Sequence, residues 1–292
     1  MGEQFKKELW YVLVEGIIDE DHAGIGNFYG YGDHLGEVAS HVLAAAEAEG
    51  FIDPRMGEAW FVAPDYEMPD DLVTLSEHVQ WSPARYVFPI ADYKSALVLP
   101  TGIAHATYES ESDPNLIQEA FCAYGHEKNS QDEYALDIVA GQARLKETFF
   151  SCIRLLSDVN GLFFRLMDFW EEDDFEVWAY YDDDIETLIA LLSSSLADTV
   201  ENGYVEIAIT ASDGESKTTL ILDPHKHIRF FTRDESLFRE ALRQVPLWGF
   251  AETDDFYHIE AGYYHWHYRP FASHTRKGFI QWLEDTGFER VG

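Results

Sequence analysis

The chain has 292 residues, of which 54 are acidic and 20 basic, so its formal net charge at pH 7 is −34. A surface of this charge repels nucleic acid and anionic membranes, and we expect neither as a partner. Hydrophobic residues make up 46% of the chain and aromatic residues 15%, which excludes a disordered polyacid. A cationic partner would explain the acidity, and adaptation to a saline habitat is the alternative explanation.

The sequence gives no sign of a membrane or an oxidising compartment. It contains no uninterrupted run of about eighteen apolar residues, so we expect no membrane span. Its two cysteines, Cys122 and Cys152, lie within apolar patterns, which predicts buried free thiols. We therefore expect a cytoplasmic protein.

In the first half of the chain we predict strands mixed with helices. A buried strand is expected at 9–18 and a glycine-rich loop at 19–32. A helix should then begin at Asp33 and end at Gly50, with Phe51 folding back on it. The other elements predicted for this half are strands at 59–63, 84–90 and 96–99, a short helix at 69–78, and helices at 115–124 and 133–157.

The glycine-rich segment lies between a predicted strand and a predicted helix, where a phosphate-binding loop would lie. Its spacing matches neither GxGxxG nor GxxxxGK[ST], and it contains no lysine. Carboxylates at both of its ends would repel a phosphate. We therefore do not expect a nucleotide site here.

The densest mixture of aromatic and acidic residues lies at 161–186. Alternating apolar and polar residues flank a four-residue acidic break, which predicts a β-hairpin with an exposed tip. The residues of this hairpin expected to be buried are Phe164, Leu166, Phe175 and Val177. Three aspartates at 182–184 precede a helical pattern and should cap that helix.

This hairpin is the candidate partner site. Its aromatic side chains would anchor a basic protein, and its carboxylates would speed and orient the approach. The candidate partner-binding residues are Trp170, Glu171, Glu172, Asp173, Asp174, Trp178 and Tyr180. Immunity proteins against basic toxins and nucleic-acid mimics use charge in this way, an analogy of composition only. The alternative is a core hairpin with a solvated, charged tip.

The second half should contain more strands. The elements predicted after the hairpin are helices at 184–200, 234–245 and 275–285, strands at 204–210, 217–222 and 227–232, and one or two strands at 256–268. Two short turns join the three strands of 204–232, and such turns connect only antiparallel strands. The predicted fold class is α+β, with a mostly antiparallel, helix-covered sheet in the second half. Sub-domains are expected at 1–150 and 151–292.

A histidine pair supports a second hypothesis, a metal-dependent enzyme (a hydrolase) that uses a divalent metal such as zinc. His265 and His267 would point to the same side of a strand and could bind a metal, with His258 in the same segment. Candidates for a third ligand are His258, Glu260, His227 and Asp223. The alternative is an amphipathic sheet face with aromatic packing. No cofactor is expected beyond this metal.

Overall fold

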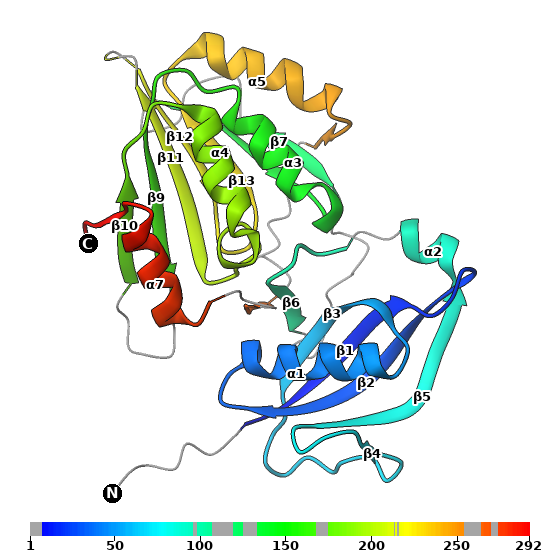
Figure 1. The fold of residues 1–292 in the computed structure, drawn as a ribbon. Coiled ribbons are helices and arrows are strands. Elements are labelled where there is room, and N and C mark those ends of the chain that lie inside the picture. Colours follow the sequence, from blue (N-terminus) through cyan, green and yellow to red (C-terminus); the bar gives the residue numbers. More distant parts are fainter. Residues whose placement is uncertain are drawn as a thin grey trace, which may run out of the picture. The chain divides into compact units, whose positions relative to one another are not determined.

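The structure is a computed structural model that describes residues 8–95, 98–106, 119–124, 133–167, 175–212, 214, 216–253, 264–269 and 274–292. The chain forms two compact units (Figure 1). The first unit comprises Met1–Pro114 and His258–Phe271, and the second comprises Asn115–Tyr257 and Ala272–Gly292. Helices and strands occur in both units, which confirms the coarse prediction of a mixed α+β protein.

The first unit is built on a sheet with the strand order β15-β6-β3-β1-β2-β5-β4. Its strands are β1 (Glu8–Ile17), β2 (His22–Gly32), β3 (Ile52–Phe61), β4 (Val73–Thr74), β5 (Val79–Pro89), β6 (Ile103–Ala106) and β15 (Tyr264–His267). Neighbouring strands are antiparallel except β3 and β6, which are parallel. The described helices of this unit are α1 (Leu35–Ala48) and α2 (Ile90–Ser95).

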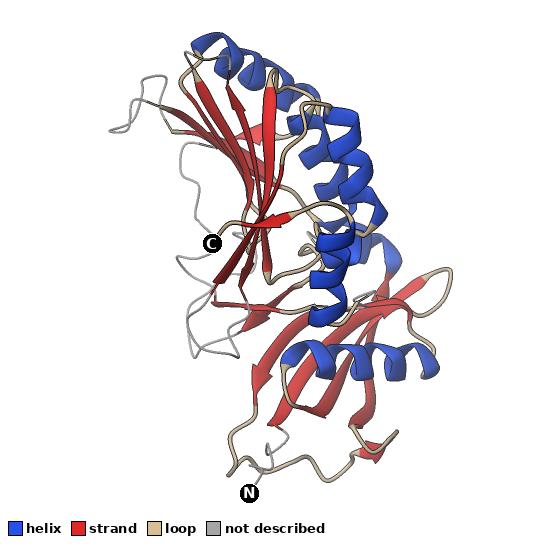
Figure 2. Cartoon of the chain, turned by 60° about the vertical axis from the view of Figure 1, so that its left-hand side comes forward, coloured by secondary structure: helices blue, strands red, loops and turns tan. Residues whose placement is uncertain are grey.

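Helix α1 lies along one face of this sheet (Figure 2) and buries its apolar side there. The predicted glycine-rich loop was wrong, because most of that segment is strand β2. Gly30 and Gly32 let the helix approach closely: a Cβ at Gly30 would lie 2.6 Å from Val38 Cγ1. A side chain there would force the helix away from the sheet.

The ends of α1 follow ordinary capping chemistry. His34 caps the first turn, since its Nδ1 accepts a hydrogen bond from the Glu37 N–H over 3.1 Å. The prediction of Asp33 as the cap was therefore wrong by one residue. Gly50 has a φ of +90° and Phe51 donates its N–H to Ala46, which confirms the predicted end of the helix.

Two further predictions for the first unit were wrong. No helix forms at 69–78, where the short strand β4 lies instead. Strand β5 continues directly into the helical turn α2. Of the strand predicted at 96–99, residues 96 and 97 lie outside the described residues, and 98–99 are not in a strand.

The second unit contains a sheet with the strand order β14-β7-β8-β13-β12-β11-β9-β10-β16. Its strands are β7 (Ala120–Ala123), β8 (Tyr134–Val139), β9 (Val159–Met167), β10 (Phe175–Tyr180), β11 (Val205–Ser212), β12 (Lys217–Leu222), β13 (Ile228–Thr232), β14 (Ala251–Glu252) and β16 (Glu289–Arg290). Its described helices are α3 (Gln142–Ile153), α4 (Ile185–Ser194), α5 (Glu235–Leu247), α7 (Arg276–Asp285) and the 3-10 helix η2 (Leu196–Asp198). One buried hydrophobic cluster joins α3, α4, α5 and α7 to the strands.

Strands β11, β12 and β13 form the predicted antiparallel meander. The helix predicted at 133–157 was wrong in its first part, which is strand β8, and only Gln142–Ile153 is helical. Every residue of β8 is buried, Asp137 included, so its sequence lacks the apolar–polar alternation that would distinguish a strand from a helix. For the same reason the helix predicted at 115–124 is wrong over its described residues, which contain β7.

The predicted hairpin is formed by β9 and β10. Phe164 and Leu166 are buried as expected, but Phe175 is 49% exposed and Val177 is only half-buried. The register explains this difference: Trp178 pairs with Phe164, so Trp178 faces the core in place of Val177. Asp184 caps α4 by accepting from the Glu186 N–H, which confirms the predicted cap.

Candidate functional site

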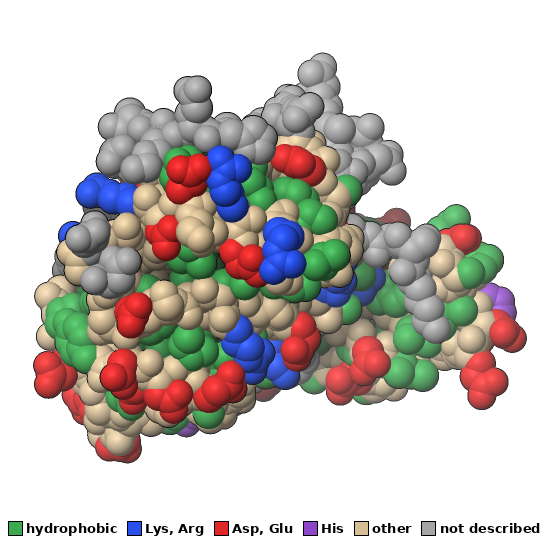
Figure 3. Space-filling model, turned by 90° about the horizontal axis from the view of Figure 1, so that it is seen from above, with side chains coloured by type: hydrophobic (Ala, Val, Ile, Leu, Met, Phe, Trp, Pro, Cys, Tyr) green, Lys and Arg blue, Asp and Glu red, His purple; other side chains and the backbone are tan. Residues whose placement is uncertain are grey.

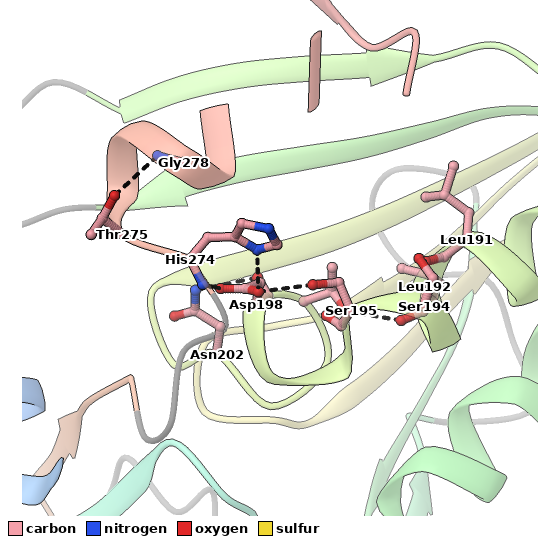
Figure 4. A network of polar contacts seen from close by, with 10 residues as sticks. Leu191, Leu192, Ser194, Ser195, Asp198, Asn202, His274, Thr275 and Gly278 are labelled. Atoms are coloured by element: carbon pink, nitrogen blue, oxygen red, sulfur yellow. Dashed lines mark hydrogen bonds and ion pairs between the residues drawn. The ribbon is translucent and has the colours of Figure 1, made fainter. Parts of the chain in front are cut away.

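Three polar side chains meet at Asp198 in the second unit (Figure 4). Asp198 is fully buried, with 0% of its surface exposed. His274 Nδ1 lies 2.9 Å from Asp198 Oδ2, and the Ser195 hydroxyl donates to the same oxygen over 2.8 Å. The His274 backbone N–H donates to the other carboxylate oxygen over 3.3 Å. One carboxylate thus joins residues 76 positions apart in the chain.

The segment around Asp198 is shaped by its own polar side chains. Thr199 donates its hydroxyl to the carbonyls of Leu192 and Ser195, and so satisfies acceptors at the end of α4. Asn202 donates to the Asp198 carbonyl over 3.3 Å and accepts from the Tyr204 N–H over 3.0 Å. The segment between α4 and β11 is therefore a fixed turn, and Asp198 ties it to the residue ahead of α7.

Serine, histidine and aspartate are the residue types of a nucleophilic triad, but their order here is different. In a triad the imidazole lies between the hydroxyl and the carboxylate. Here the carboxylate of Asp198 lies between Ser195 and His274, and the Ser195 hydroxyl donates to it. We conclude that this network orients and holds α7, and we assign it no nucleophile.

A second buried polar group lies at the turn between β12 and β13. Lys226 is 1% exposed, and its Nζ donates to the carbonyls of Asn202 and Val205 over 2.6 and 3.2 Å. Burial lowers the pKa of Lys226 to about 7. Asp223 accepts from the His227 N–H over 2.9 Å, and burial raises the pKa of the Asp223 carboxyl. These groups stabilise the turn from within.

The partner-binding residues predicted on the hairpin are only partly described. Trp170 and the four acidic residues 171–174 lie outside the described residues. Trp178 is 5% exposed within the core cluster, and its Nε1 donates to Glu176 over 3.3 Å. Tyr180 is half-buried and packs on Phe288 at 5.3 Å between ring centroids. Its hydroxyl donates to Asp182 Oδ2 over 3.2 Å.

Of the predicted metal ligands, His258 and the side chain of His265 lie outside the described residues, and His267 is half-buried in β15. The sheet register pairs His265 with His105 of β6, and His105 with Glu58 of β3. Burial lowers the pKa of His105 to about 4, so its imidazole is neutral at pH 7. Sequence reasoning missed His105 and Glu58, because the pairing of distant strands leaves no local pattern.

The described side chains include no group of three or more His, Cys, Asp or Glu placed to hold a metal ion. His227 and Asp223, two of the proposed third ligands, belong to the second unit, whereas β15 belongs to the first. Among the described helices, none is both long and apolar enough to cross a membrane.

The face of the first sheet opposite α1 carries aromatic and acidic side chains. Tyr11 lies beside Tyr29 of β2 and stacks on Trp60 of β3, at 3.8 Å between ring centroids. In the next row, Leu13 of β1 lies opposite Asn27 and Glu58. A further row across the strands contains Tyr86, Ile25, Glu15 and Arg55.

Charge is distributed differently in the two units. Over the described residues of the first unit, twelve carboxylate side chains are exposed: Asp19, Glu20, Asp21, Asp33, Glu47, Asp53, Asp65, Glu67, Asp70, Asp71, Glu77 and Asp92. No Lys or Arg side chain described in this unit is exposed: its three arginines are half-buried, and Lys6, Lys7 and the side chain of Lys94 lie outside the described residues.

The second unit has exposed cations, namely Lys146, Arg154, Lys217, Arg233, Arg239, Arg243, Lys277 and Arg290. Several of them pair with carboxylates, as Arg239 does with Glu235 at 2.6 Å. Figure 3 shows Lys and Arg side chains among Asp and Glu side chains on one face of the molecule. Among the described exposed side chains, cations therefore lie beside the carboxylates of the second unit but not beside those of the first.

Comparisons of the chain with family models, with curated protein sequences and with solved structures gave no match.

Proposed function

We propose that the protein is an acidic binding protein whose partner is a basic protein. One observation carries this proposal: the described surface of the first unit exposes twelve carboxylates and no lysine or arginine. A surface of one sign raises the local concentration of oppositely charged partners and their rate of association. An immunity-type inhibitor of a basic toxin, or a nucleic-acid mimic, would act through such a surface.

The internal use of the arginines in the first unit supports this proposal. Arg55 pairs with Glu15 at 3.2 Å, and Arg85 donates to the Glu49 carbonyl over 2.7 Å. Both guanidinium groups also lie over aromatic rings of the same unit. Both arginines are therefore paired with groups of their own unit. The negative charge of the exposed carboxylates stays available to attract a partner.

Binding of a labelled nona-arginine peptide tests the proposal. We expect the protein to bind the peptide at about 20 mM salt and to lose at least about tenfold in affinity at about 200 mM, because salt screens exposed charges. Fluorescence anisotropy measures both affinities, and nona-glutamate is the control peptide. Absence of nona-arginine binding at low salt would refute the function.

The same salt series separates partner binding from adaptation to a saline habitat. Thermal unfolding is measured at each salt concentration. If the protein folds only in molar salt, its negative charge reflects adaptation to a saline habitat, and the proposal of a basic partner would then be withdrawn. Replacing the four acidic residues 171–174 by serine measures the share of the acidic hairpin tip in binding.

The sheet register favours one alternative function, a zinc-dependent hydrolase. His265, His105 and Glu58 occupy paired positions on three neighbouring strands, and imidazole and carboxylate are zinc ligands. If this alternative holds, the protein takes up about one equivalent of zinc in a titration, and His105→Ala removes that uptake. Val79→Ala, a change in β5 away from these strands, is the control. Uptake below about a tenth of an equivalent by the unmodified protein rejects the metal site.

A further inference from the structure

We infer that the face of the first sheet opposite α1 docks an extended, arginine-bearing segment of the partner. This inference rests on the proposed function and assigns it a surface. The face is formed by β3, β1, β2 and β5, and its cross-strand rows combine tyrosine and tryptophan rings with carboxylates. Arginine is the side chain that such a combination recognises, since it forms carboxylate pairs and stacks on aromatic rings.

The two faces of this sheet are covered differently. On one face, α1 packs against buried residues such as Val12 and Phe28. On the other face, residues 62–72 cover Tyr11 and Tyr29 at one end, and α2 lies at the other end, where Tyr93 packs near Phe88. Between them the described side chains of Leu13, Ile25 and Asn27 stay half-exposed.

The chain itself shows how this face binds an arginine. Arg55 lies opposite Glu15 in the register, and its Nε and Nη2 donate to Glu15 Oε2 over 3.3 and 3.2 Å. Its guanidinium carbon lies 4.2 Å from the centroid of the Tyr93 ring. One guanidinium is therefore already held between a carboxylate and an aromatic ring on this face.

Further aromatic rings of the same face remain accessible. Tyr86 is 69% exposed at the β5 side, and Trp60 is half-exposed on β3. Tyr66, in the segment 62–72, is 45% exposed and has exposed carboxylates on either side of it in the chain, Asp65 and Glu67. These groups combine rings and carboxylates as the Arg55 site does, and the cation–ring contacts of the described arginines involve other rings.

The negative charge around this face determines which kind of molecule can bind there. A nucleic acid would be repelled by the exposed carboxylates. A second copy of the chain would bring two faces of the same negative sign together, which like-charge repulsion opposes. A basic segment of a partner protein meets neither obstacle. Its arginines can alternate between carboxylates and rings across the rows.

Two matched pairs of variants test this surface with the labelled nona-arginine peptide. Asp65→Asn, Glu67→Gln and Asp70→Asn together remove three charges beside the face. Glu20→Gln, Asp33→Asn and Glu47→Gln together remove three exposed charges elsewhere on the unit. Because both triples change the net charge equally, a difference between them reports local docking. We expect about a tenfold loss of affinity for the first triple and less than about threefold for the second.

The aromatic pair uses neighbouring residues of β5, whose side chains point to opposite faces. We expect Tyr86→Ala to weaken binding about three- to fivefold and Val87→Ala to leave it unchanged. Both side chains are mainly exposed, at 69% and 48%, so neither change should unfold the protein, which thermal unfolding verifies. Trp60→Ala against Phe61→Ala repeats the comparison on β3.

The possible outcomes distinguish the proposed function, binding of a basic partner, from the proposed docking surface. If the unmodified protein does not bind the peptide, the proposed function itself fails. If it binds but the face variants match their controls, docking on this face is refuted and the function stands. A dimer of the unmodified protein that Tyr86→Ala dissociates in sedimentation would show a second copy as the occupant, and would overturn the inference. Lower affinity in the face variants alone, with an unchanged monomer, supports it.

Discussion

Asp198→Ala is expected to lower the free energy of unfolding by about 2–3 kcal/mol, because it leaves a buried hydroxyl without its acceptor. The variant removes the acceptor for the Ser195 hydroxyl and for two nitrogens of His274. The buried Ser195 hydroxyl then pays the desolvation cost of a donor that has lost its acceptor. Urea unfolding of the variant beside the unmodified protein measures the loss.

Asp234→Ala is the matched control for this variant. Asp234 caps α5 by accepting from the N–H groups of Ser236 and Leu237, without a buried network behind it. Its loss should cost about 1 kcal/mol. A cost for Asp198→Ala no larger than that of Asp234→Ala would contradict the anchoring role of Asp198.

Lys226 should make stability depend on pH above neutrality. The pKa of Lys226 is about 7 in the folded protein, below its ordinary value of 10.5. Between these values the unfolded lysine holds a proton that the folded one has lost, so the free energy of unfolding rises with pH. From pH 7 to about pH 9.5 the expected rise from this group is roughly 3 kcal/mol.

Lys226→Met tests this effect, since it keeps the length of the side chain and removes the titrating amine. Urea unfolding at pH 7, 8 and about 9.5 should give a steeper rise for the unmodified protein than for the variant. Lys217→Met, at an exposed lysine, is the control. Burial raises the pKa of tyrosines such as Tyr268, so their opposing titration falls above this range. Parallel stability curves for the unmodified protein and Lys226→Met would show that Lys226 is not buried as described.

Features that depend on neighbours in the chain could be predicted from the sequence. Strand β1, the end of α1 at Gly50, the meander of β11, β12 and β13, and the Asp184 cap of α4 are of this kind. Each is governed by side-chain alternation, a short turn, or a cap within one helical turn. Such signals lie within a few residues of one another.

Features that depend on packing against distant segments could not be predicted in this way. Strand β8 has no alternation because all of its residues are buried, and β2 has glycine at positions 30 and 32 because α1 packs closely there. The side of β10 that faces the core was misassigned, because a shift of one residue in register exchanges the two faces of a strand.

The candidate sites show the same division. Net charge was evident from composition, but the sequence did not show that the exposed cations among the described residues all lie in the second unit. Tertiary structure alone decides three features: the return of β15 to the first unit, the pairing of His105 with His265, and the contact of Asp198 with His274. The sequence specifies which side chains are available, and strand register and packing of distant segments decide which of them meet.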